Sequence, residues 1–214
     1  MYRLHGYFSQ NSMKTLYVLQ EVAPLFEFHF VNLAKREQLT DAFRSKTPVG
    51  KAPVLEHAGR FLFESGAICR YVAANEGSAL YPAEPWQRAQ VEQWLDFFTC
   101  HLGLHLNTLF FQLLVKPRLG LGDPDQARCE EARVFARQQF GIVDRHLAQH
   151  GHLANDRLSI ADLAALAYVE QVRMVDFSLD EYPAVRAWFA ALEARPSVAQ
   201  ARSLVAPYLK AAAA

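Results

Sequence analysis

The first 80 residues alternate between short β-rich runs and stretches with helical periodicity. Residues 2–7 and 26–33 have strand character, whereas the apolar side chains within 11–22 recur at helical spacing. This order predicts one β-α-β unit, and we expect its crossover to be right-handed.

A second set of short elements follows. A polar helical stretch lies around residues 38–43, and the segment TPVGKAPVL at 47–55 predicts a loop that enters a strand. Residues 54–55 and 61–63, separated by four residues that include Gly59, predict a β-hairpin. Residues 64–75 then have one apolar helical face. Together these elements predict an α/β domain with a mixed or parallel sheet.

Strand signals end at NEGSALYPAEPW, residues 75–86, where glycine, serine and proline concentrate. Residues 87–208 show long helical periods instead. We therefore predict an α/β domain at 1–78, a linker at 79–86 and an all-helical domain at 87–214. Within the helical part, Ser159 and Asp162 have the spacing of a capping box, which predicts a helix start at this point.

Composition narrows the classes of function. The chain has 22 basic and 22 acidic residues, so it lacks the basic excess typical of nucleic-acid binding. Its hydrophobic share of 51% and charged share of 21% are those of a packed globular protein. The N-terminus does not have the pattern of a signal peptide, and we find no uninterrupted apolar run of about 18 residues. We therefore expect a cytoplasmic protein that is not inserted in a membrane.

Cysteine and histidine spacing argues against disulfides and metals. Cys69, Cys100 and Cys129 form no C-x-x-C pair, which fits a reducing compartment. Cys69 and Cys100 fall on apolar helix faces and are predicted to be buried, whereas Cys129 lies beside two glutamates and is predicted to be exposed. His101 and His105 lack the glutamate of H-E-x-x-H and a third ligand, so we predict no metal site.

Five short segments carry the candidate chemistry. They are SQNSMK at 9–14, GKAPVL at 50–55, FESGAI at 63–68, LSIADL at 158–163 and RPS at 195–197. In this order, over about the whole chain, the sequence resembles the cytosolic glutathione transferases, and within them a bacterial theta-like or Nu-like branch that uses serine.

The resemblance implies both a fold and a set of partners. The fold is a thioredoxin-like α/β N-terminal domain that binds glutathione, followed by an all-α helical-bundle C-terminal domain that shapes the electrophile pocket. The partners are glutathione as co-substrate, a small hydrophobic electrophile and a second copy of the chain in a homodimer, with no cofactor. Phe8 and aromatic residues of the helical domain are candidates for the electrophile pocket.

The resemblance also places residues around glutathione. It implies a cis peptide bond before Pro53 that turns the Ala52 backbone toward the cysteinyl group. Glu64 and Ser65 lie where a strand gives way to a helix, and unpaired N–H groups at such a junction suit a carboxylate. Ser65 would hold the α-carboxylate of the γ-glutamyl end and Glu64 its α-ammonium group, although Ser65 could instead cap the helix.

Two further polar residues are assigned to the rest of the peptide. The resemblance places Lys51 near the peptide and Gln38 near the glycyl carboxylate. Both could equally be solvated surface residues.

Three residues compete to activate the thiol. Ser9 matches the catalytic serine of theta-like and phi-like enzymes, Asn11 matches an asparagine that faces the sulfur in Nu-type enzymes, and Tyr7 lies where other classes use tyrosine. Ser12 is expected to cap the first helix, with Lys14 on its exposed side. The leading function is conjugation of glutathione to electrophiles. The alternatives are glutathione-dependent disulfide or peroxide reduction of Nu type, and a non-catalytic binding or regulatory protein.

Overall fold

The computed structural model describes residues 1–23 and 25–213, and its contacts divide the chain into two compact units. The first unit comprises Met1–Ala83 together with Glu193–Ala214, and the second comprises Glu84–Leu192. The predicted fold class is confirmed: a thioredoxin-like α/β part is followed by a helical part. The sequence assigned the whole of 87–214 to the helical domain, whereas these contacts group the C-terminal helix with the α/β elements. The domain boundaries read from the sequence therefore remain predictions.

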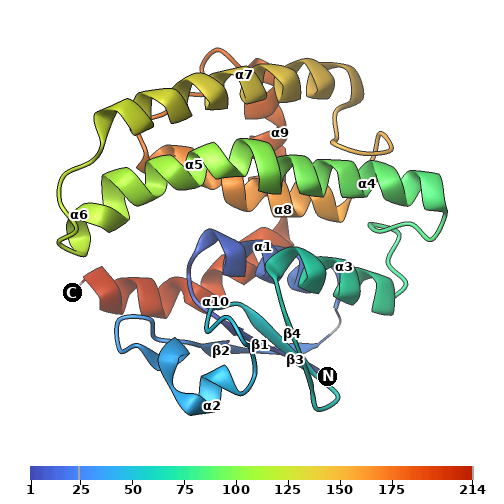
Figure 1. Ribbon diagram of the computed structural model, residues 1–214. Coiled ribbons are helices and arrows are strands. Elements are labelled where there is room, and N and C mark those ends of the chain that lie inside the picture. Colours follow the sequence, from blue (N-terminus) through green and yellow to red (C-terminus); the bar gives the residue numbers. More distant parts are fainter. Residues whose placement is uncertain (24, 214) are drawn as a thin grey trace. The chain divides into compact units, whose positions relative to one another are not determined.

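The first unit is built on a four-stranded sheet of order β2-β1-β3-β4. Strand β1 pairs parallel with β2 and antiparallel with β3, which in turn pairs antiparallel with β4. In Figure 1, α1 and α3 lie on one face of the sheet and α2 lies on the other. In chain order the elements are β1 (Tyr2–Gly6), α1 (Gln10–Val22), β2 (Phe26–Phe30), η1 (Glu37–Leu39), α2 (Asp41–Arg44), β3 (Val54–His57), β4 (Arg60–Phe63), α3 (Ser65–Asn75) and α10 (Pro196–Ala213).

Helix α1 is buried without interruption from Ser12 to Leu19. It packs against α3 and α10, and Glu21 near its end binds Arg195 and Ser197. Two predictions about this helix are wrong. Ser12 lies inside the helix and accepts a hydrogen bond from the Tyr7 backbone N–H at 3.0 Å, and Lys14 is only 3% exposed because neighbouring elements surround the helix.

Charged side chains cover the other face of β1 and hold its neighbours in register. Arg3 lies opposite Glu27 on β2 and Glu56 on β3, and its guanidinium donates to both carboxylates, at 2.7 Å and 3.3 Å. His5 contacts Glu56 at 3.1 Å. Burial lowers the pKa of His5, and the hydrogen bond from His5 lowers the pKa of Glu56.

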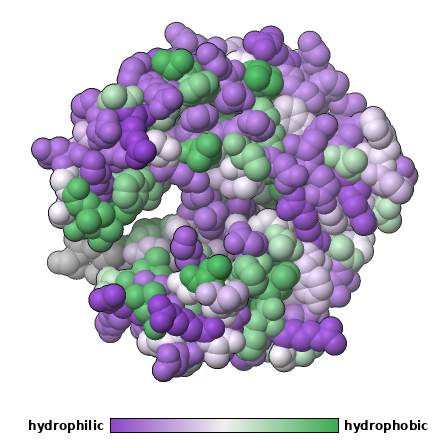
Figure 2. Space-filling model, in the orientation of Figure 1, coloured by the Kyte–Doolittle hydropathy of each residue, from purple (hydrophilic) through white to green (hydrophobic). Residues whose placement is uncertain are grey.

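The second unit consists of helices. A continuous helical run from Pro85 to Arg118 contains two π-helical turns, and in Figure 1 α7 runs alongside its α5 part while α8 packs against α4. Figure 2 shows the surface of α7 as mainly hydrophilic with isolated apolar side chains, as expected for a helix with one buried face. The elements are α4 (Pro85–Phe97), η2 (Phe98–Leu102), α5 (Gly103–Phe110), η3 (Phe111–Val115), α6 (Lys116–Arg118), α7 (Gln126–His150), α8 (Ile160–Val169), η4 (Glu170–Met174) and α9 (Pro183–Glu193).

A fully buried carboxylate, Asp162, organises the core of this unit. Its Oδ1 accepts hydrogen bonds from the Leu153 backbone N–H at 3.0 Å and from Trp188 Nε1 at 2.9 Å. Its Oδ2 accepts from the backbone N–H and the hydroxyl of Ser159, both at 2.9 Å. The capping box predicted at the start of α8 is therefore present, and the same carboxylate also ties α8 to the preceding loop and to α9.

The first prediction concerns the close approach of α5 to α8 at Gly103. A Cβ at this position would overlap the Tyr168 ring and the Phe98 carbonyl oxygen, whereas one at Gly141 in α7 would meet only the end of the Arg145 side chain at 3.6 Å. We expect Gly103→Ala to lower the free energy of unfolding by about 1–3 kcal/mol through overpacking. Gly141→Ala should raise it by about 0.5–1 kcal/mol, because alanine favours the helix. Chemical denaturation measures both changes, and a neutral Gly103→Ala would contradict this packing.

The second prediction compares how much the Ser159 cap and the Asp162 carboxylate each contribute to the free energy of unfolding. Ser159→Ala removes one capping hydroxyl and should cost about 1 kcal/mol. Asp162→Asn replaces one acceptor oxygen with a donor that faces other donors, so we expect a larger loss, about 3 kcal/mol or more. Urea denaturation of both variants tests this order, and equal losses would show that the Trp188 and Leu153 bonds contribute little.

Candidate functional site

Six of the eight residues predicted to form the site line one pocket of the first unit. The pocket has a volume of about 130 Å³ and lies where the loop before β3 meets the first turns of α1 and α3. Val49 and Phe63 also line it. Sequence reasoning missed these two as site residues, although Val49 directly precedes the segment at 50–55 and Phe63 is the first residue of the segment at 63–68. The lining residues are Asn11, Val49, Lys51, Ala52, Pro53, Phe63, Glu64 and Ser65.

The Ala52–Pro53 peptide bond is cis, as predicted. Pro53 is buried, and the next residue, Val54, pairs with Phe63 across the hairpin. The bend at the proline therefore lies at the start of β3, with Ala52 directed along the pocket wall. Gly50 precedes it at a φ of 58°, a left-handed conformation in which glycine avoids the strain of a side chain.

Glu64 occupies an unusual backbone conformation at the junction of β4 and α3. Its φ is 67° and its ψ is 110°, and this residue, not Ser65, takes the N-cap position of α3. Holding a residue with a side chain at positive φ costs about 1–3 kcal/mol, and residues in such strained conformations cluster at functional sites. The conformation leaves the Glu64 side chain exposed at the pocket and makes Ser65 the first helical residue.

The N-termini of α1 and α3 meet at this pocket. The Ser65 hydroxyl is nearly buried and donates to Oδ1 of Asn11 at 3.3 Å. Ser65 therefore does not cap its own helix through its side chain; it joins the two helix starts. Backbone N–H groups and the positive ends of both helix dipoles gather beside the pocket, an arrangement that favours a bound carboxylate or thiolate.

Ser9 lies at the N-cap of α1 but outside the pocket lining. Its carbonyl oxygen accepts hydrogen bonds from the backbone N–H groups of Ser12 and Met13 at 3.0 Å and 2.9 Å. Its hydroxyl makes no capping hydrogen bond. The side chain is half-buried at the positive end of α1, two residues from Asn11.

Lys51 and Gln38 differ in their relation to the pocket. Lys51 is exposed and lines it. Gln38 lies in η1 and does not line it, and its buried Oε1 has no hydrogen-bond partner among the described residues. Lys51 thus joins five other predicted residues in the pocket lining, whereas Gln38 lies outside the lining.

The three cysteines have environments that partly reverse the expected ones. Cys69 is buried as predicted, but Cys100 is exposed and Cys129 is fully buried. Burial raises the pKa of Cys69 to about 12. This thiol therefore stays protonated at neutral pH and is not a nucleophile.

The fold and the pocket together define a class: a thioredoxin-like domain with a cis-proline loop and two converging helix N-termini, followed by a helical domain. Comparison with known proteins gives the same class. The family model for the glutathione S-transferase N-terminal domain matches residues 1–74, and that for the C-terminal domain matches residues 105–196. The chain belongs to the glutathione S-transferase family.

Individual relatives match over most of their length. Glutathione S-transferase 1 of Zea mays is 30% identical over 202 residues, which cover 93% of this chain and 94% of that protein. Glutathione S-transferase 3 of Zea mays is 34% identical over 197 residues, covering 88% and 87%. A solved structure of glutathione S-transferase-I bound with lactoylglutathione is similar with a TM-score of 0.85 and 30% identity, and covers 95% of this chain and 99% of that chain.

The third prediction concerns thiol reactivity. In the native protein we expect Ellman's reagent to modify Cys100 rapidly and Cys69 and Cys129 only on unfolding, because the thiolate must be accessible to react. Cys100→Ser should remove the fast phase, whereas Cys129→Ser should leave it unchanged. A fast phase that survives Cys100→Ser would contradict the burial of the other two thiols.

Proposed function

We propose that the protein is an enzyme that activates the thiol of glutathione and adds it to small hydrophobic electrophiles. The observation that supports this most strongly is the gathering of Asn11, Lys51, cis-Pro53, Glu64 and Ser65 around one pocket. In this proposal the N–H groups at the start of α3 and the Ser65 hydroxyl bind the γ-glutamyl carboxylate. The exposed Glu64 carboxylate pairs with its ammonium group.

The pocket volume of about 130 Å³ fits only part of a tripeptide, since ligand sites usually span about 300–1,000 Å³. We assign this pocket to the γ-glutamyl end. The cysteinyl backbone then lies along Ala52, and the sulfur points toward the N-terminus of α1. In this arrangement Lys51 and Gln38 would contact the rest of the peptide.

Ser9 is our first choice for the residue that activates the thiol. Its hydroxyl is not used as a cap, so it can donate to a thiolate held at the positive end of α1. A thiol of pKa about 8.5 is about 3% ionised at pH 7, and lowering that pKa by about 2 gives about 25-fold more thiolate. Nucleophilicity falls at the same time, which removes about 6- to 10-fold of the gain. Most of the acceleration must therefore come from holding sulfur and electrophile together.

Asn11 is the alternative candidate for activating the thiol, and a direct role for it would indicate a second function. Its side chain is already engaged with Ser65, so in our proposal it supports the pocket and does not replace Ser9. If Asn11 contacted the sulfur directly, reduction of mixed disulfides or peroxides would be favoured. A non-catalytic role would require loss of glutathione binding, and the retained pocket argues against it.

We also propose a phi-like class for the chain. The sequence led us to expect a bacterial theta-like or Nu-like branch, but the two relatives named above are plant proteins, which point to the phi class. A serine that activates the thiol is compatible with either branch.

A homodimer in the cytoplasm with a role in detoxification completes the proposal, and it rests on family resemblance. Phe61 on β4 and Tyr71 on α3 are exposed aromatic residues that a partner subunit would cover. Glutathione serves as co-substrate and no cofactor is required. Among residues 1–23 and 25–213, no three histidine, cysteine or carboxylate side chains cluster in a way that could hold a metal ion.

The helix from Pro85 to Arg118 is long and apolar enough to cross a membrane by length and composition alone. This is weak support for a membrane span, since core helices of soluble proteins pass the same test. It packs against α7 and α8, and several of its apolar side chains, among them Leu102, Leu106 and Leu109, are fully buried in the helical unit. We therefore propose that it is a core helix.

The fourth prediction tests thiol activation. We expect Ser9→Ala to raise the apparent pKa of the kcat/KM profile with an aryl halide by about 2, toward that of free glutathione. At pH 6.5 this lowers kcat/KM about sixfold; the deficit should vanish near pH 8 and reverse above about pH 9, because the variant's thiolate is more basic and then also largely ionised. Calorimetry should find glutathione affinity within about threefold of that of the unaltered protein.

The Asn11→Ala variant is the matched comparison. It should weaken glutathione binding through the lost Ser65 contact while leaving the pH profile in place. If Ser9→Ala leaves the profile unmoved and Asn11→Ala shifts it, Asn11 is the activating residue. Failure of the unaltered protein to bind glutathione would leave only the non-catalytic alternative.

A further inference from the structure

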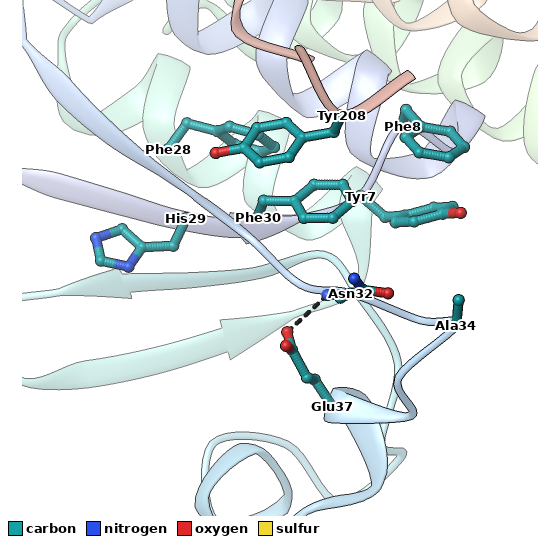
Figure 3. Close-up of a pocket in the computed structure, with 9 residues that line it drawn as sticks. All are labelled: Tyr7, Phe8, Phe28, His29, Phe30, Asn32, Ala34, Glu37 and Tyr208. Atoms are coloured by element: carbon teal, nitrogen blue, oxygen red, sulfur yellow. Dashed lines mark hydrogen bonds between the residues drawn. The ribbon is translucent and has the colours of Figure 1, made fainter. Parts of the chain in front are cut away.

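The two edge strands of the sheet in the first unit border cavities of different character. At β2, the cavity shown in Figure 3 is lined in part by Phe8, a candidate for the electrophile pocket. At β4, an open groove of about 530 Å³ lies between the end of α2 and the start of the strand. This volume falls within the range of about 300–1,000 Å³ that is usual for small-molecule sites. We call it the β4 groove, and none of the eight residues predicted to form the glutathione site lines it.

Among the described residues, three basic side chains and no acidic side chain line the β4 groove. The basic residues are Arg44 at the end of α2, Lys46 in the loop that follows, and Arg60 at the start of β4. In the described part of the chain none of the three forms an ion pair, whereas Arg3 of the same unit binds two carboxylates. The groove therefore holds three positive charges that the protein itself does not neutralise.

The Glu56 carboxylate on the neighbouring strand is already engaged. Glu56 lies opposite Phe61 in the β3–β4 ladder, and its carboxylate accepts from Arg3 at 3.3 Å and contacts His5 at 3.1 Å. Lys46 Nζ instead lies 4.5 Å from the centroid of the Phe61 ring. Such a cation–π contact orients the ammonium group but does not cancel its charge. Lys46 therefore remains able to bind an anion.

The backbone that carries the three cations is held in place without a ligand. The backbone N–H groups of residues 45–47 donate to carbonyl oxygens of α2 at 2.9–3.2 Å. On the other side of the groove, Ala58 and Gly59 have φ values of 50° and 72°, as in a tight two-residue hairpin turn, and Arg60 follows directly as the first residue of β4. A preorganised site loses less entropy when it binds. Because the loop N–H groups are used internally, recognition depends on the basic side chains.

We propose that the β4 groove binds a small molecule that carries two linked phosphate groups, at a site separate from that for glutathione. One phosphate group has a charge of about −1.5 to −2 at pH 7, so two linked groups balance three cations better than one group or a single carboxylate does. The guanidinium groups of Arg44 and Arg60 can each present paired donors to phosphate oxygens, and Lys46 adds a point charge. Because the proposed homodimer also covers Phe61, the cations and not this ring define the site.

The fifth prediction compares anions that differ in charge. At pH 7.5, with EDTA present so that no metal ion neutralises the ligand, we expect calorimetry to give an affinity about tenfold higher for pyrophosphate than for inorganic phosphate, with acetate the weakest. Raising the salt concentration from about 0.05 M to about 0.5 M should weaken pyrophosphate binding, because exposed charges are screened. ADP should bind within about threefold of pyrophosphate and adenosine should not compete, because the cations recognise the diphosphate group.

Two outcomes would overturn the proposal. Saturation with S-hexylglutathione should change the pyrophosphate affinity by less than about twofold, and displacement of pyrophosphate would show that the two ligands share one site. Equal affinities for pyrophosphate and acetate would show that the groove does not select linked phosphate groups.

Variants assign the binding to the β4 groove. Lys46→Met and Arg60→Gln should each weaken pyrophosphate about fivefold, because each removes one cation from the groove. Lys35→Met is the matched control: Lys35 is an exposed cation of the same unit that does not line the groove, and its loss should leave the affinity within about twofold. Thermal unfolding checks that all three variants are folded. If Lys46→Met and Lys35→Met weaken pyrophosphate equally, general charge and not the groove binds the anion.

Discussion

The enclosure of helix α1 is the constraint on which the first unit depends. The helix packs against α3 and α10 and is buried continuously from Ser12 to Leu19. Polar groups in this stretch must find partners inside: Ser12 accepts the Tyr7 N–H, and Thr15 donates to the Ser12 carbonyl oxygen at 2.7 Å. Because burial fixes the axis and rotation of α1, it also fixes where Ser9 and Asn11 lie at its start. The position of the proposed thiol-activating group is therefore a consequence of core packing.

This enclosure also explains where sequence reasoning succeeded and where it failed in the first unit. The cis bond before Pro53 could be predicted because it is encoded by a short local motif, and the β-α-β order followed from periodicity. The burial of Lys14 could not, because a helix covered on several sides has no polar face to predict. The positive φ of Glu64 could not be predicted either, because glutamate rarely adopts that conformation.

The helical unit shows the same contrast between local and long-range information. Ser159 and Asp162 are three residues apart, so their capping box could be read directly. That Asp162 also accepts from Trp188, 26 residues away, depends on how α8 and α9 pack. The burial of Cys129 was predicted wrongly because it too depends on long-range packing. Cys129 is fully buried despite two neighbouring glutamates, because one narrow face of α7 enters the core. Residue type predicts burial poorly when a helix has a single buried face.

The turn from β1 into α1 lies between residues that line two different pockets of the first unit. On one side, the starts of α1 and α3 present N–H groups that favour an anion, with Ser9 and Asn11 among them. On the other, Tyr7 and Phe8 line a second cavity together with Glu37. Residues on either side of this turn thus lie at different pockets, and the balance of 22 basic and 22 acidic residues could not indicate either one. Net charge excludes classes of partner, whereas the local arrangement of helix ends and side chains selects the ligand.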